Sequence, residues 1–142
     1  MSDPIRSISQ NNFLLAAQQE VSHDNTLSGN GTEASPLGVN VGNWTEVTND
    51  ITASSSLIQA GAWFFYYNKP LKLINIIGEI RVVGQGDVYE LPLKYRPLKH
   101  FVVNSPAGTN FIDYTQDTGK FVARSGTNGY FSIYCTLPCT GE

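Results

Sequence analysis

Charged side chains are scarce in this sequence. Asp, Glu, Lys and Arg make up 15% of its 142 residues, against roughly 25% in an average soluble domain. The 9 basic residues are outnumbered by 12 acidic ones. Because attraction to phosphates needs clustered Lys and Arg, we expect no nucleic-acid partner. No apolar run approaches the roughly 20 residues that a helix needs to cross a bilayer, so we expect no membrane insertion.

Metal ligands are also few. The sequence holds two cysteines, Cys135 and Cys139, and two histidines, His23 and His100, which lie far from the cysteines along the chain. A metal site needs about four ligands, and no phosphate-binding glycine loop or calcium-loop pattern occurs. We therefore expect neither metal nor cofactor. The cysteine pair fits either a small disulfide loop or two free thiols near the end of the chain.

The residues needed for catalysis are not assembled in any recognisable motif. No Gly-x-Ser-x-Gly sequence is present, and His100 reads as an ordinary residue at a strand boundary. Glycoside hydrolysis needs two carboxylates facing one cleft, and Asp113 and Asp117 are near each other in sequence. Asp117, however, begins an Asp-Thr-Gly turn. We therefore expect no enzymatic activity. An enzyme that degrades polysaccharide ranks behind the two binding or structural functions given below.

Neutral polar residues, 13 glycines and 7 prolines take the place of the missing charge. These residues favour exposed strands and turns over helices, so the composition predicts an all-β protein. Turn signals every 8–12 residues after residue 43 indicate a β-sandwich or barrel. The predicted strands are 44–48, 51–58, 62–67, 71–83, 88–91, 101–103, 109–115, 120–124 and 130–137.

Two predicted strands carry more apolar side chains than one core face requires. The aromatic run 62–67 is either a core strand with alternate rings inside or a platform for sugar rings. The strand 71–83, with Gly78 as a bulge or bend, is apolar on both faces for much of its length. Its second face is expected to pack against another subunit.

The first 42 residues differ from the rest. Residues 1–21 fit a short helix or an extended arm. Residues 22–42 consist almost entirely of turn formers and small residues, with Gly29-Asn30-Gly31 as a tight turn. This segment has too few apolar residues to build its own core, so it is either a linker or a segment that packs on other copies of itself.

Two motifs resemble those of a known family. Residues 23–39 (HDNTLSGNGTEASPLGV) are similar to a segment that recurs in bacteriophage fibre proteins. Residues 91–97 (LPLKYRP) resemble an element in the C-terminal heads of phage receptor-binding proteins, where it follows a long strand with a mid-strand glycine. The resemblance implies a homotrimeric virion fibre with an attachment segment at 1–21 that binds other virion proteins, an intertwined β neck at 22–42, and a β head at 43–142.

The resemblance also implies adhesion to a host-surface saccharide. Similar heads of lactococcal phages bind sugar through a His and an Asp on one strand and a Trp on the return strand. Here Asp113 matches the Asp, while Phe111 stands at the His position and no Trp matches. Arg124 would contact an anionic group instead, or simply form a cross-strand ion pair with Asp113.

Loop residues complete the predicted binding surface. Tyr114 and Tyr130 are further candidate ligand-binding residues, because aromatic rings on loops are accessible to sugars. The loops 84–87, 104–109 and 125–129 are expected to form the ligand surface at one end of the head. The alternative function is a structural fibre or decoration protein of the capsid or baseplate without a receptor of its own.

Overall fold

The computed structural model describes residues 27–39, 42–108, 110–124 and 127–142. The chain divides into two compact units, Met1–Val41 and Gly42–Glu142, and each is described by itself. The predictions made for residues 1–21 lie outside the described residues.

The described part of the first unit is a small antiparallel hairpin of β1 (Leu27–Ser28) and β2 (Gly38–Val39). The turn requires a glycine at position 29, where φ is +79° and a Cβ atom would lie 1.9 Å from the Pro36 carbonyl oxygen. Backbone N–H groups of Asn30 and Gly31 donate to the Ser35 carbonyl at 2.9 and 3.0 Å. No side chain described between 27 and 38 is fully buried, so local hydrogen bonds hold this hairpin.

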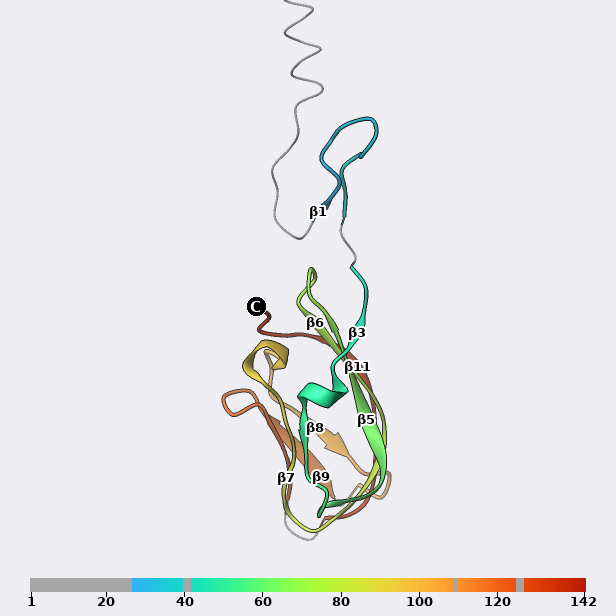
Figure 1. Ribbon diagram of the computed structural model, residues 1–142. Helices are drawn as coiled ribbons and strands as arrows, with labels where there is room; N and C mark the ends of the chain where they lie inside the picture. Colours follow the sequence, from blue (N-terminus) through green and yellow to red (C-terminus); the bar gives the residue numbers. More distant parts are fainter. Residues whose placement is uncertain (1–26, 40–41, 109, 125–126) are drawn as a thin grey trace, which may run out of the picture. The chain divides into compact units, whose positions relative to one another are not determined.

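The second unit is a β-sandwich, which confirms the all-β prediction (Figure 1). One sheet has the order β4-β7-β10-β9-β8 and the other β11-β6-β5-β3, and all pairs are antiparallel. The strands are β3 (Thr45–Glu46), β4 (Thr52–Ala53), β5 (Ile58–Asn68), β6 (Leu73–Val83), β7 (Gly86–Glu90), β8 (Phe101–Asn104), β9 (Phe111–Thr115), β10 (Lys120–Ala123) and β11 (Asn128–Pro138), with 3-10 helices η1 (Thr48–Asp50) and η2 (Leu93–Tyr95).

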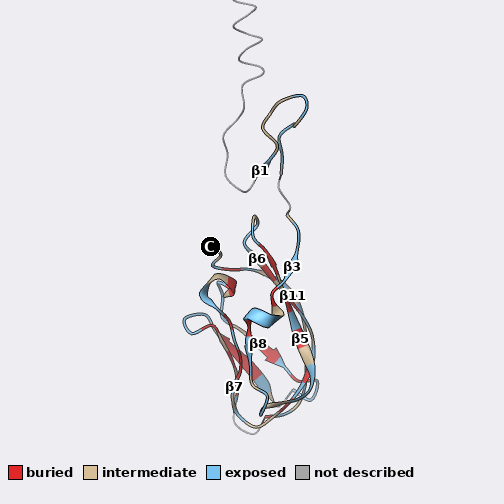
Figure 2. Cartoon of the chain, in the orientation of Figure 1, coloured by how far each residue is buried: buried red, intermediate tan, exposed pale blue. Residues whose placement is uncertain are grey.

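Aromatic side chains fill the space between the two sheets. Because successive side chains of a strand point to opposite faces, Trp63 and Phe65 of β5 are fully buried while Phe64 between them is 43% exposed. The Trp63 ring stacks on Tyr89 of β7 at 5.3 Å and meets the edge of Phe121 of β10 at the same distance. Figure 2 shows buried residues in strands of both sheets. The run 62–67 is therefore a core strand.

Three sequence predictions need correction. Strand 51–58 is reduced to Thr52–Ala53, because residues 54–57 form a turn closed by the Ile58 N–H and the Ser54 carbonyl at 3.1 Å. Strand 44–48 is reduced to Thr45–Glu46 and leads into η1. Gly78 is not a bulge, since the β5–β6 register runs through it without a shift; the strands approach so closely there that a Cβ atom would lie 2.3 Å from the Ala62 carbonyl oxygen.

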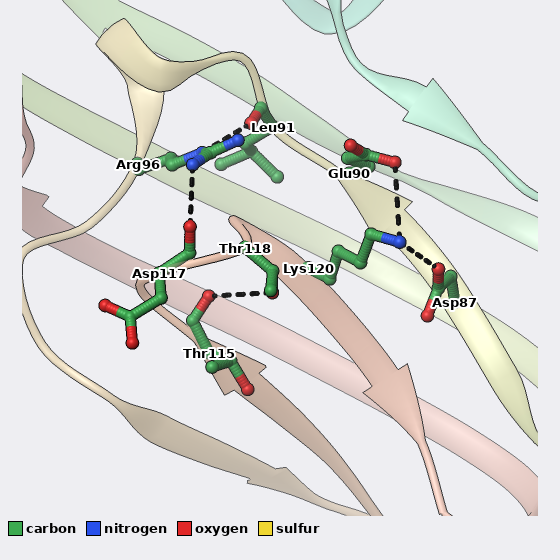
Figure 3. Close-up of polar contacts among 8 residues, drawn as sticks. All are labelled: Asp87, Glu90, Leu91, Arg96, Thr115, Asp117, Thr118 and Lys120. Carbon is green, nitrogen blue, oxygen red and sulfur yellow. Dashed lines mark hydrogen bonds and ion pairs between the residues drawn. The ribbon is translucent and has the colours of Figure 1, made fainter.

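The LPLKYRP segment has a structural role in this fold. The Arg96 guanidinium donates through Nε to the Leu91 carbonyl at 3.0 Å and through Nη1 to the Asp117 carbonyl at 2.9 Å (Figure 3). A Cβ atom on Gly119 would lie 2.3 Å from the same Nε. Arg96 thus ties the segment after β7 to the β9–β10 turn, so this part of the motif positions strands.

Candidate functional site

Asp113 lies on the outer face of the five-stranded sheet, near the middle of β9. Its cross-strand neighbours are Val102 of β8 and Val122 of β10. Although it points away from the sandwich core, its side chain is only 12% exposed. A carboxylate this shielded from water needs partners that compensate its charge.

Two cationic or potentially cationic side chains supply that compensation. The Arg124 guanidinium contacts Asp113 Oδ2 directly, and Nε2 of His100 lies 2.9 Å from Oδ1. The predicted pairing of Asp113 with Arg124 is confirmed. His100, expected to be an ordinary boundary residue, joins this cluster as well. The sequence does not reveal this contact, because only the β8–β9 register places residue 100 diagonally across from residue 113.

One oxygen of the cluster has an incomplete set of interactions. Oδ1 of Asp113 is buried, and the 2.9 Å approach of His100 is not aligned as a hydrogen bond, so Oδ1 has no hydrogen-bond donor among the described residues. The His100 side chain is 58% exposed, so this ring lies between Oδ1 and the solvent. A ligand hydroxyl that displaces this ring would donate the missing hydrogen bond to Oδ1.

Apolar and aromatic surface lies next to the cluster. Phe111, two residues before Asp113 on the same face of β9, is 38% exposed, and Val102 is 43% exposed. Arg124 also lines an open depression of about 480 Å³ together with Gln85, Gly86, Val122 and Ala123. The surface thus combines a carboxylate acceptor, guanidinium donors and an aromatic ring.

Of the three loops predicted to form the ligand surface, 84–87 and the described part of 125–129 are in contact, and Asn110, which follows the loop 104–109, contacts the latter as well. The Gly84 N–H donates to the Thr127 carbonyl at 2.8 Å, and Nδ2 of Asn110 donates to the Asn128 carbonyl at 3.1 Å. Together with the Gln85 and Arg124 walls of the depression, these contacts place the described parts of the loops at one end of the sandwich.

The structure separates the other two candidate residues from this cluster. Tyr114 is fully buried, and its hydroxyl donates to the Pro97 carbonyl at 3.0 Å. Burial also raises the pKa of this hydroxyl. Its assignment as a ligand-binding residue is therefore corrected to a core residue. Tyr130 is 50% exposed but lies on β11 of the other sheet, with the Arg81 guanidinium 6.0 Å from its ring centre.

The remaining carboxylate candidate lies in a turn. Asp117 is exposed and its carbonyl is held by Arg96. Farther along this sheet, Lys120 forms a 2.7 Å ion pair with Asp87 and lies 3.9 Å from Glu90 (Figure 3). The hydrogen bond from Lys120 to Asp87 raises the pKa of the lysine. Ion pairs this accessible to water are typical of a solvent-facing surface.

The two cysteines are free thiols. Cys139 is buried and Cys135 is half-buried, and burial raises the pKa of both. Since the thiolate is the reactive form, we expect both to react with a disulfide reagent near pH 8 at least about tenfold more slowly in the native protein than after unfolding. Absorbance of the released thiol measures both rates; one fast equivalent in the native protein would contradict this expectation.

Neither a metal site nor a membrane span is found in the described ranges. There, no group of three or more His, Cys, Asp and Glu side chains is placed to hold a metal ion, and no helix is long and apolar enough to cross a bilayer. Comparisons with family models, with curated proteins and with solved structures found no match to this chain.

Proposed function

We propose that this chain is a non-enzymatic, homotrimeric bacteriophage fibre protein of the virion, whose head binds a host-surface saccharide. The observation that carries the proposal is Oδ1 of Asp113, a buried carboxylate oxygen without a hydrogen-bond donor among the described residues, beneath an exposed histidine. The resemblance of residues 23–39 and 91–97 to phage fibre proteins supports the choice of virus and host surface. Residues 1–21 would attach the fibre to other virion proteins.

The chemistry of the cluster favours a neutral, hydroxyl-rich ligand over an anionic one. Arg124 already neutralises Asp113, so an anionic ligand would compete with this carboxylate for the guanidinium. A sugar hydroxyl instead donates to Oδ1 and accepts from the outer N–H groups of Arg124, which is 49% exposed. The exposed Phe111 ring offers a surface for the apolar face of a sugar ring. Three heads on one fibre raise weak affinity through avidity.

The test compares two Asp→Asn variants in binding to glycan arrays and to cells of a susceptible host. Asp113→Asn removes the charged acceptor and is expected to weaken binding per head by about ten- to a hundredfold, the value of one charged hydrogen bond. Asp117→Asn, an exposed carboxylate in the nearby turn, is the matched control and should bind like the unmodified protein. Circular dichroism of both variants checks that they fold.

Two results would contradict the proposal. Absence of binding by the unmodified protein across a susceptible host's surface would favour a structural fibre or decoration protein. Release of products from host polysaccharide, lost in both Asp variants, would indicate an enzyme that uses the two carboxylates as a pair.

A further inference from the structure

The tripeptide Pro-Leu-Lys occurs three times in the second unit, at 70–72, 92–94 and 97–99. The first copy lies in the β5–β6 turn, the second leads into η2, and the third precedes β8. Figure 1 shows the β5–β6 turn and η2 at the same end of the sandwich as the C-terminus. Three backbone hydrogen bonds join the copies to the last residues of the chain: from Cys139 to Lys72 at 2.9 Å, from Gly141 to Lys94 at 2.8 Å, and from Leu98 to Pro138 at 3.0 Å.

Each copy presents its leucine to solvent. Leu71, Leu93 and Leu98 are 38%, 64% and 46% exposed. An apolar depression of about 240 Å³ lies beside the third copy, and its walls are Leu98, Lys99, Leu137 and Pro138. Since a cavity of about 150 Å³ accommodates a benzene ring, this depression has room for one bulky apolar side chain. Exposed leucines beside such a depression are typical of an interaction surface.

Positive charge surrounds these leucines, although the chain as a whole is acidic. A lysine follows each of them in the sequence. Two carboxylates at this end are already engaged: Glu142 pairs with Lys69 and Lys94 at 3.1 and 3.2 Å, and Asp50 accepts from the Tyr95 hydroxyl at 2.7 Å. Lys72 and Lys99 are exposed and have no ion-pair partner in the described ranges. Both cations are therefore available to the carboxylates of a partner.

The backbone holds Lys72 in a conformation that lysine rarely adopts. Its φ is +50°, and it is the only non-glycine residue with a positive φ in the part of the chain that the structure describes. Its side chain lies so close to Gly141 that a Cβ atom there would be 2.8 Å from Cγ and 2.9 Å from Cδ of Lys72. Residues in such conformations persist only where their surroundings fix them, and they cluster at binding sites. The stem of Lys72 is thus held against the C-terminal segment, which lowers the entropy lost when its ammonium group binds a carboxylate.

We infer that this end of the sandwich binds an acidic, apolar segment of a partner protein. One apolar side chain of the segment enters the depression beside Leu98, and its carboxylates pair with Lys72 and Lys99. This partner is additional to the proposed saccharide, which uses the Asp113 cluster. A protein segment fits this end better than an anionic membrane does, because membranes recruit clusters of about four to eight Lys and Arg and only two unpaired lysines are present here.

The test measures binding of a short, capped peptide of alternating Glu and Leu to the full chain by fluorescence anisotropy. The unmodified protein should bind this peptide but not its Gln-Leu counterpart. Lys72→Asn removes one cation and keeps a residue that tolerates a positive φ, so it should weaken binding about three- to tenfold. Leu98→Asp puts a carboxylate at the depression and should weaken binding at least about tenfold. Lys120→Asn, the same substitution on β10, is the matched control and should bind like the unmodified protein.

Cross-linking locates the contact. A carbodiimide joins the carboxylates of the bound peptide to lysines that they touch, and mass spectrometry should find the products at Lys72 and Lys99 rather than at Lys120. No binding of the Glu-Leu peptide, equal binding of both peptides, or equal cross-linking at Lys120 would overturn the inference. Circular dichroism checks that each variant folds.

Two other occupants of this end would give distinct results, and either result would overturn the inference. Phosphatidylglycerol vesicles that bind more tightly than the peptide, and lose this binding in Lys72→Asn, would indicate a membrane. A lower sedimenting mass of the Leu98→Asp protein would indicate a second copy of the chain. Saccharide binding should be unchanged in Lys72→Asn, so failure here leaves the Asp113→Asn comparison as a separate measure of the proposed function.

Discussion

Replacing Trp63 by alanine is expected to lower the free energy of unfolding by about 3–5 kcal/mol, the usual cost of deleting a large buried aromatic side chain. Trp63 is fully buried between the two sheets, where it contacts Tyr89 and Phe121. Its Nε1 also donates to the Phe131 carbonyl at 3.0 Å. The variant therefore leaves both a cavity and a carbonyl without its donor, so we expect a value near the upper end of the range.

Two further variants separate these causes. Trp63→Phe keeps most of the ring volume but removes the donor, and should cost about 1–3 kcal/mol. Trp44→Ala removes the other tryptophan, which is 44% exposed, and should change stability by no more than about 0.5 kcal/mol. Urea unfolding followed by circular dichroism at one protein concentration measures all three. Equal losses for the two alanine variants would mean that Trp63 is not the centre of the core.

Gly78→Ala is expected to produce the second large loss of stability. The φ of Gly78 is +141°, and a Cβ atom there would lie 2.3 Å from the Ala62 carbonyl oxygen of the paired strand. Holding an alanine in this backbone conformation lowers the free energy of unfolding by about 1–3 kcal/mol. The contact with backbone adds to this, because β5 and β6 must separate at the middle of their pairing to admit a methyl group.

Gly108→Ala is the matched control for the Gly78 variant. Gly108 also has a positive φ, +73°, but a Cβ atom there would meet nothing within 4 Å. Gly108→Ala should lower the free energy of unfolding only through its backbone conformation, by about 1–2 kcal/mol. Thermal or urea unfolding under the same conditions measures both variants. If the two alanine variants lose the same stability, the close approach of β5 and β6 at Gly78 is not a constraint on the fold.

The strands of the second unit were predictable wherever apolar side chains alternate. The run 62–67 and the long strand after residue 71 appear as β5 and β6. Burial of Trp63, Phe65 and Ile76 fixes which face of each strand points into the core. The stretch 51–58 was predicted wrongly, since its serines are compatible with a strand by composition but close a turn through local hydrogen bonds.

The candidate site was predictable only in part. Asp113 and Arg124 could be proposed from a motif and from neighbouring predicted strands, and the structure confirms their contact. Tyr114 could not be placed correctly, because a shift of one residue in strand phase exchanges an outward ring for a buried one. His100 could not be found, because its approach to Asp113 depends on how β8 pairs with β9.

The sequence by itself determined the β class, the turn positions of most strands and the lack of a catalytic or metal motif, because these depend on local propensities and on residue types. Only the tertiary structure decided which strands share a sheet and in which register. That register brings His100 to Asp113, sends Tyr114 into the core, and aligns Phe64, Ile77 and Tyr134 in one row. Contacts between strands far apart along the chain depend on packing of the whole sandwich, which no local pattern encodes.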